Sequence, residues 1–152
     1  MFKKIITAFS SIVAIVITLY AGKYFTSMGV NGWYSEAIKP ALTPPNYVFP
    51  IVWSILYVLQ AISLYRILYY GLGSDVVSIF VIQLSLQVLW CLTFFAVGSA
   101  VMGLLVVIML IVTAIALIKM LVGRDIWSAR LLYPYLIWIL FAGYLNLGFV
   151  IW

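Results

Sequence analysis

Residues 76–118 read VVSIFVIQLSLQVLWCLTFFAVGSAVMGLLVVIMLIVTAIALI and contain no charged side chain. As one α-helix these 43 residues would extend about 64 Å at 1.5 Å per residue, whereas the hydrocarbon core of a bilayer is only about 30 Å thick. The run must therefore fold back once, and Gly98-Ser99 offers the turn. The stretch predicts two membrane-spanning helices, at about 76–97 and 100–122.

The composition of the whole chain agrees with a membrane protein. Of 152 residues, 68% are hydrophobic and only 7% are charged, against about 25% charged residues in soluble domains. That excludes a soluble globular domain, a disordered chain and a nucleic-acid-binding module. The chain has no histidine, so zinc catalysis, histidine general-base chemistry and histidine-ligated haem are excluded, and we expect no metal site and no obligatory cofactor.

Three further apolar segments complete the predicted fold. They give helices at about 5–22, 47–70 and 129–152, so the sequence predicts an all-α integral membrane protein, a single domain over 1–152 with five transmembrane helices in a compact bundle. Residues 23–46 contain three of the five prolines and read as an ordered lid loop. A signal peptide is the alternative interpretation of the first segment.

Basic residues indicate the orientation. Six of the eight lie at the N-terminus or in the two loops on its side, and only Lys23 and Lys39 lie on the other side. By the positive-inside rule we expect a cytoplasmic N-terminus and a lid loop on the opposite side of the membrane.

Polar and aromatic side chains inside the predicted spans point to a site, because each is costly to place in lipid. In the third helix, Gln83, Gln87, Trp90 and Phe94 share one face. Hydrogen bonding between helices and contact with a ligand are both open for the two amides.

Two other helices and the loop carry similar residues. The members are Trp53 and Tyr57 in the second helix, Tyr135, Trp138, Ala142 and Asn146 in the fifth, and Trp33 and Tyr34 in the loop. If these faces converge they form an aromatic pocket for a large, flat, apolar ligand, with the loop as its lid. The alternative is that the aromatic rings only fill a core.

The fourth helix is almost purely aliphatic, and we expect it to be peripheral and to face lipid. No acidic residue lies inside a span, which argues against an active, proton-coupled transporter. No serine or threonine has a histidine or buried lysine to activate it, so hydrolytic chemistry is not indicated.

Several blocks resemble one known family. They are Trp33-Tyr34, Lys39-Pro40, Thr43-Pro44-Pro45, Val48-Phe49, Val52-Trp53 and Leu56-Tyr57, then Gln83 to Trp90 with Phe94-Phe95, and finally Pro134-Tyr135, Trp138, Phe141-Ala142 and Leu145-Asn146. From about residue 33 to the end, the chain resembles the TspO/MBR family of tryptophan-rich sensory proteins and translocator proteins, also known as peripheral-type benzodiazepine receptors.

The resemblance implies a five-helix membrane protein, often dimeric, with a pocket under the first loop. The pocket of that family binds porphyrins and haem, sterols in some members, and benzodiazepine-type drugs. The positions that match pocket positions are Trp33, Tyr34, Trp53, Tyr57, Gln83, Gln87, Trp90, Trp138 and Ala142. The chain departs from the family where Gln87 replaces the usual asparagine, where Leu42 replaces an aromatic residue, and near the C-terminus, which lacks the base of the sterol motif.

We therefore expect a membrane receptor or sensor for tetrapyrroles. The alternatives are light- and oxygen-dependent porphyrin breakdown, with Trp33 and Trp138 as candidate participants, transport of tetrapyrroles, and a structural subunit without a small ligand. We also expect a homodimer in which the third helix contributes much of the contact. Its small-residue stripe is Ala96, Ser99, Ala100 and Gly103.

Overall fold

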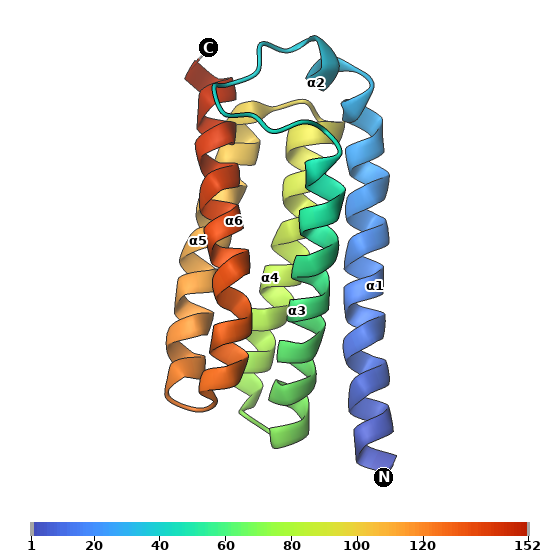
Figure 1. Ribbon diagram of the computed structural model, residues 1–152, viewed down its shortest axis with the longest axis vertical. Coiled ribbons are helices and arrows are strands. Elements are labelled where there is room, and N and C mark those ends of the chain that lie inside the picture. Colours follow the sequence, from blue (N-terminus) through green and yellow to red (C-terminus); the bar gives the residue numbers. More distant parts are fainter. Residues whose placement is uncertain (1, 152) are drawn as a thin grey trace.

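The computed structural model describes residues 2–151. Five long helices stand side by side in one bundle, and a lid segment crosses the end where the C-terminus lies (Figure 1). The elements are α1 (Phe2–Val30), α2 (Trp33–Glu36), α3 (Val48–Tyr70), α4 (Ser74–Cys91), the π-helical turn η1 (Leu92–Ala96), α5 (Ala100–Val122) and α6 (Ile126–Ile151). Within residues 2–151, five helical segments, with α4 and η1 counted as one, are long and apolar enough to cross a membrane, which confirms the expected fold.

The fold-back within the charge-free run lies where the sequence predicts it. The helical segment ends at Ala96 and the next begins at Ala100. Gly98 has a positive φ of 72°, a conformation that glycine adopts without steric cost. The Ser99 hydroxyl oxygen accepts a hydrogen bond from the backbone N–H of Met102 at 3.2 Å and so caps α5.

The first helix is longer than predicted, and the expected bounds of 5–22 for the helix and 23–46 for the lid loop are wrong. α1 continues to Val30, because Lys23 and Tyr24 are exposed on its surface and do not interrupt its packing. Gly29 lies directly against η1, where an added Cβ would lie 2.2 Å from the backbone oxygen of Phe95. The lid is therefore a shorter segment, from about residue 31 to 47, with α2 inside it.

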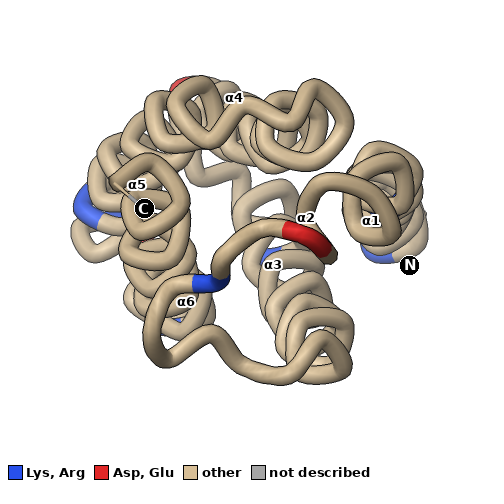
Figure 2. The backbone as a smooth tube through the Cα atoms, turned by 90° about the horizontal axis from the view of Figure 1, so that it is seen from above, with Lys and Arg blue, Asp and Glu red and all other residues tan. Residues whose placement is uncertain are grey.

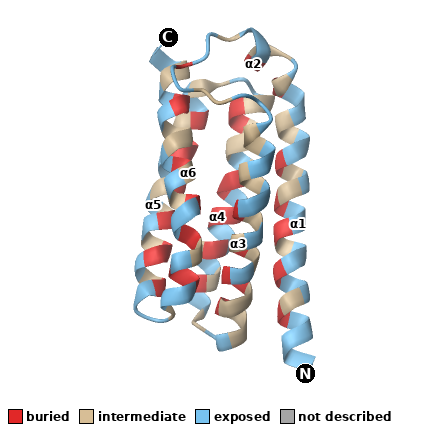
Figure 3. Ribbon diagram, in the orientation of Figure 1, coloured by how far each residue is buried: buried red, intermediate tan, exposed pale blue. Residues whose placement is uncertain are grey.

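The expectation that helix 100–122 is peripheral is also wrong. In the most hydrophobic 18-residue stretch of each helix, 39% of the residues of α5 are buried, against 22% in α1 and 28% in α6. It packs against both α4 and α6, and buried residues recur along its length (Figure 3). In lipid a buried face and a lipid-facing face are both apolar, so an aliphatic sequence does not distinguish them. The least buried helices are α1 and α3, with 22% each, and α1 lies beside α3 and α4 (Figure 2).

The small-residue stripe serves the interior of the bundle rather than an outer surface. Gly103 is buried, and a Cβ there would lie 2.8 Å from the Asn146 side-chain oxygen and 3.0 Å from Phe94. Ala96, Ser99 and Ala100 lie at the tight turn and are half-buried. Gly103 is therefore not available to a partner subunit, and that part of the predicted dimer interface is wrong.

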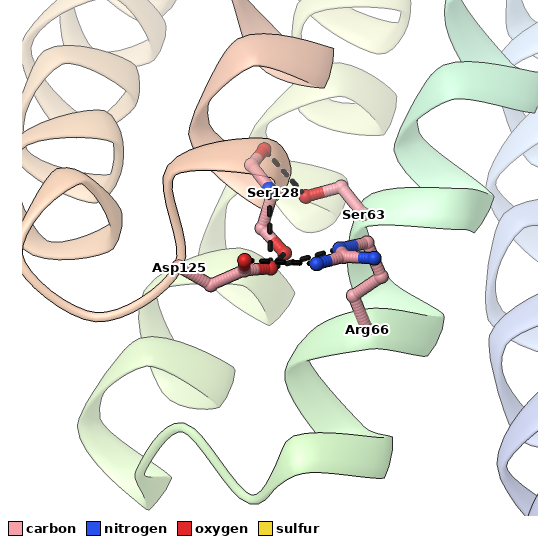
Figure 4. Close-up of polar contacts among 4 residues, drawn as sticks. All are labelled: Ser63, Arg66, Asp125 and Ser128. Carbon is pink, nitrogen blue, oxygen red and sulfur yellow. Dashed lines mark hydrogen bonds and ion pairs between the residues drawn. The ribbon is translucent and has the colours of Figure 1, made fainter.

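At the N-terminal end of the bundle, a polar cluster joins α3 to the start of α6 (Figure 4). The Arg66 guanidinium donates to both carboxylate oxygens of Asp125, at 2.8 and 2.9 Å. Asp125 accepts from the backbone N–H of Ser128 at 3.2 Å, and Ser63 donates to the Ser128 carbonyl at 3.0 Å. The hydrogen bonds from Arg66 hold the pKa of Asp125 well below its usual range.

Candidate ligand-binding site

A layer of amide side chains occupies the middle of the bundle. A small cavity lies among Gln60 of α3, Gln83 and Gln87 of α4 and Tyr135 of α6. Its volume is about 10 Å³, roughly the room that one water needs. All four side chains are buried. The predicted convergence of the polar faces of α4 and α6 is therefore present here, and α3 adds Gln60.

Gln83 is fully used by the protein itself. Its amide nitrogen donates to the Leu110 carbonyl at 2.8 Å and also contacts the Thr113 hydroxyl. Its oxygen accepts from the Tyr135 hydroxyl at 2.6 Å. For this amide, hydrogen bonding between helices accounts for every polar atom.

Gln87 is different. Its nitrogen makes one long contact of 3.4 Å with the side-chain oxygen of Gln60. Its own oxygen is buried and has no hydrogen-bond partner, the one such side-chain atom found in the described residues 2–151. A buried acceptor without a hydrogen-bond partner destabilises the folded state by about 1–3 kcal/mol. A donor that entered the cavity and bonded to this oxygen would remove that cost.

One turn closer to the lid lies a second polar pair. The Trp90 indole N–H donates to the Asn146 side-chain oxygen at 3.0 Å, and the Asn146 nitrogen donates to the Ala100 carbonyl at 2.7 Å. Trp90 stacks on Phe94 with a centroid distance of 5.5 Å and an interplanar angle of 9°. Both amide atoms of Asn146 thus have protein partners, and this pair ties α4 to α5 and α6.

An aromatic wall follows α3 and α6. Trp53 packs on Tyr57 at 5.5 Å and approaches Tyr135 at 6.4 Å between ring centroids. Trp138 packs edge-on against Phe49 at 5.9 Å. Trp53, Trp90, Trp138 and Ala142 all pack against the same buried cluster, which is built around Leu56, Leu86 and Tyr135. These flat faces are half-buried, so they could turn toward a ligand between α3 and α6.

The lid closes the bundle through Trp33. Its indole N–H donates to the Phe95 carbonyl at 3.0 Å, on the π-helical turn. Its ring packs edge-on against Phe94 at 5.1 Å and Phe149 at 6.0 Å, and Tyr34 is buried beside them. Turns of this type are often found at functional sites, because they place a backbone group where a regular helix would not.

The far part of the lid rests on α6. Pro40 lies so close to Gly148 that a Cβ there would be 2.4 Å from the Pro40 ring, and the Tyr144 hydroxyl donates to the Ala41 carbonyl at 3.1 Å. Leu42 has a positive φ of 68° and is largely exposed. Burial raises the pKa of the Tyr34 phenol. The lid is therefore held at two points, at Trp33 near its start and at Pro40 and Ala41 near its middle.

The site residues thus form three levels rather than one pocket. Trp33 and Tyr34 belong to the lid cluster, Trp90 and Asn146 to the level below it, and the glutamines and Tyr135 to the centre. Two participants are missing from the sequence-based set. Gln60 follows Tyr57 by three positions and Phe149 follows Asn146 by three, so helical spacing could have found both.

Comparisons with known proteins agree with this architecture. The sequence profile of the TspO/MBR family matches residues 10–152. The tryptophan-rich protein TspO of Archaeoglobus fulgidus is 38% identical over 139 residues, which cover 90% of each chain. Protein CrtK of Rhodobacter capsulatus is 31% identical over 126 residues, 80% of this chain and 78% of the relative.

A human relative matches a smaller share of the chain. The translocator protein of Homo sapiens is 32% identical over 122 residues, which cover 75% of this chain and 70% of the relative. The family profile spans nearly the whole chain, and the five long helices are those of a membrane protein. The chain therefore belongs to the TspO/MBR family of membrane proteins.

Proposed function

We propose that the protein is a membrane receptor or sensor that binds porphyrins or haem, and related flat apolar ligands such as sterols or benzodiazepine-type drugs. The site lies between α3 and α6 beneath the lid. The observation that carries the proposal is the unpartnered oxygen of Gln87, buried in the small central cavity beside Gln60 and Tyr135. Trp53 of α3 and Trp138 of α6 add half-buried ring faces. Aromatic walls stack on a flat ring, and a free acceptor takes an N–H or O–H donor.

The arrangement described here is closed. The cavity beside Gln87 has room for about one water, far less than a tetrapyrrole needs. Binding a ring therefore requires the lid to lift and α3 to separate from α6 near Trp53 and Trp138. With no histidine in the chain, we expect the ring to be held by stacking and shape rather than by an imidazole bond to its iron.

The proposed orientation places the N-terminus in the cytoplasm and the lid on the opposite side. Its support is the distribution of bases, since Lys3, Lys4, Arg66, Lys119, Arg124 and Arg130 all lie at the helix ends remote from the lid. A ligand would then enter from the non-cytoplasmic side or from the outer part of the bilayer.

A porphyrin titration of the protein in lipid nanodiscs tests the proposal. Trp53→Ala or Trp138→Ala should weaken protoporphyrin binding about 5- to 150-fold, which corresponds to about 1–3 kcal/mol for a lost aromatic stack. Trp127→Ala is the matched control, because Trp127 is 58% exposed at the other end of α6 and packs on Arg130. The porphyrin's own fluorescence is measured, so the loss of a tryptophan does not alter the signal.

If both site variants bind as tightly as the wild type while remaining folded, the assignment of the site is wrong. Titrations in the dark and under light distinguish a receptor from an enzyme. A receptor leaves the absorption spectrum of the bound porphyrin unchanged in both, whereas light-dependent breakdown bleaches it.

A further inference from the structure

A second hollow lies on the outer side of the bundle, between the N-terminal half of α1 and the C-terminal half of α3. Ala8, Ser11 and Ile12 line it from α1, and Ala61, Ile62 and Tyr65 line it from α3. It has a volume of about 200 Å³ and opens outward. It exists because three of its lining residues are small, and it shares no residue with the site beneath the lid.

The hollow presents an apolar surface. The Ser11 hydroxyl donates to the Thr7 carbonyl of its own helix at 2.8 Å, so it offers no free donor to a polar occupant. At this depth in a bilayer the surrounding solvent is hydrocarbon, and a void left empty would forfeit dispersion contacts on all its sides. An acyl chain is the occupant that the bilayer supplies.

Two lysines lie where the contact between α1 and α3, here called the seam, reaches the N-terminal end of α1. Lys4 precedes Ala8, Ser11 and Ile12 by four, seven and eight positions, so all four lie on one face of α1. The ammonium groups of Lys3 and Lys4 lie 5.3 and 6.0 Å from the ring centroid of Tyr69.

The ring of Tyr69 links the lysines to the hollow. It stacks on the ring of Tyr65, which lines the hollow, at 5.6 Å and an angle of 13°. The seam therefore has a fixed order toward the membrane surface. The apolar hollow comes first, then the rings of Tyr65 and Tyr69, and then the ammonium groups of Lys3 and Lys4.

The two lysines have no carboxylate partner in the described part of the chain. Of the three acidic residues, Asp75 binds Arg124 at 2.6 Å and Asp125 binds Arg66 at 2.8 Å. Glu36 belongs to α2, at the lid end of the bundle (Figure 2). The positive charge at the end of the seam is therefore left for an anion from outside the protein.

We propose that the seam between α1 and α3 is a binding site for one anionic phospholipid. An acyl chain occupies the hollow beside Ala8, Ser11 and Ala61, and the phosphate of the headgroup lies between the ammonium groups of Lys3 and Lys4. The site selects an anionic headgroup through the two lysines and holds the chain by shape.

Native mass spectrometry of the detergent-solubilised protein tests this with added phosphatidylglycerol or phosphatidylcholine. The wild type should retain one phosphatidylglycerol about tenfold more than one phosphatidylcholine, because each lysine near an anionic headgroup contributes several-fold to binding. Lys3→Gln combined with Lys4→Gln should abolish the preference. Lys119→Gln combined with Arg130→Gln removes the same charge at the same end of the bundle, on α5 and α6, and should leave the preference intact.

A second pair of variants tests the hollow itself. Ala61→Leu fills it and should lower retention of both lipids, whereas Val112→Phe, at an exposed position on α5, should not. Equal retention of the two lipids by the wild type overturns the proposal. So does an equal loss of preference in the two charge variants, which would indicate general surface electrostatics. The lysines are exposed, so their replacement leaves the fold intact and the test remains decisive even if Ala61→Leu fails to fold.

Discussion

Gln83 and Gln87 are identical side chains one turn apart on α4, yet their surroundings give them different roles. Gln83 satisfies the Tyr135 hydroxyl and the Leu110 carbonyl, whereas the oxygen of Gln87 has no partner. A protein that only needed to fill its core would gain stability from an apolar residue at position 87. The retained polar atom is therefore best explained by a ligand or a water that uses it.

Replacing each glutamine with leucine separates these roles. Gln83→Leu should lower the free energy of unfolding by about 2–4 kcal/mol, because the Tyr135 hydroxyl and the partner of the lost amide are left unpaired. Gln87→Leu should change it by less than about 1 kcal/mol but weaken porphyrin binding. Thermal unfolding in detergent and porphyrin titration measure the two effects. Equal destabilisation by both variants would mean that Gln87 is as structural as Gln83.

At the scale of elements, the polar cluster at the start of α6 fixes the position of that helix against α3. Asp125 accepts from Arg66 and from the first turn of α6, so one carboxylate serves as both ion-pair partner and helix cap. Because α6 carries Tyr135 and Trp138, this contact at the remote end helps to hold one wall of the candidate site.

Asp125→Asn should lower the stability of the protein by about 2 kcal/mol at pH 7, since it removes charge-assisted hydrogen bonds. The pKa of Asp125 is lowered in the folded state, so its stabilisation is complete above the ordinary carboxyl value of 3.8 and is lost as the pH falls below it. The difference in unfolding temperature between wild type and variant should stay constant from pH 7 to about 5 and narrow below about 4. A difference that widens on acidification would contradict this account of the cluster.

The elements also show what a sequence can and cannot predict. The number of spans and the turn at Gly98-Ser99 follow from the charge-free length and the bilayer thickness, and both are confirmed. The end of α1 does not follow, because Lys23 and Tyr24 can lie on a helix that reaches the headgroups. The burial of α5 does not follow either, because the buried and the lipid-facing sides of that helix are both aliphatic.

The sequence predicts which residue types form the candidate site better than it predicts how they are arranged. Spacing brings Gln83, Gln87 and Trp90 to one face of α4, and the structure brings that face against α6 through Tyr135 and Asn146. Which amide would find partners depends on carbonyls and hydroxyls of other helices, such as Leu110, that no local pattern reveals.

At the scale of the whole molecule, the outer face of α4 remains the best candidate for a dimer contact. Ser78, Ile82, Ser85 and Leu89 repeat at intervals of four, three and four and are all exposed. In lipid, helices associate where small residues allow close approach, and a symmetric pair is the commonest assembly.

We predict a homodimer through this face. Ser85→Phe should shift the protein toward monomer in nanodiscs, measured by mass photometry, because the larger side chain separates the two helices. Val112→Phe, at an exposed position of α5, should not. If the wild type is monomeric in lipid, or if Ser85→Phe dimerises equally well, the interface lies elsewhere or does not exist.

The central claim is that a porphyrin lies between α3 and α6 beneath the lid, and its own photochemistry can report its position. Illuminated protoporphyrin generates singlet oxygen, which oxidises nearby tryptophans, and peptide mass spectrometry then gives the oxidation rate at each indole. With one equivalent bound, we expect Trp53 and Trp138 to be oxidised several-fold faster than Trp127, although Trp127 is the more exposed and would react first with oxygen arriving from solution. Oxidation of Trp127 at the same rate as Trp138, or faster, would contradict a site between these helices.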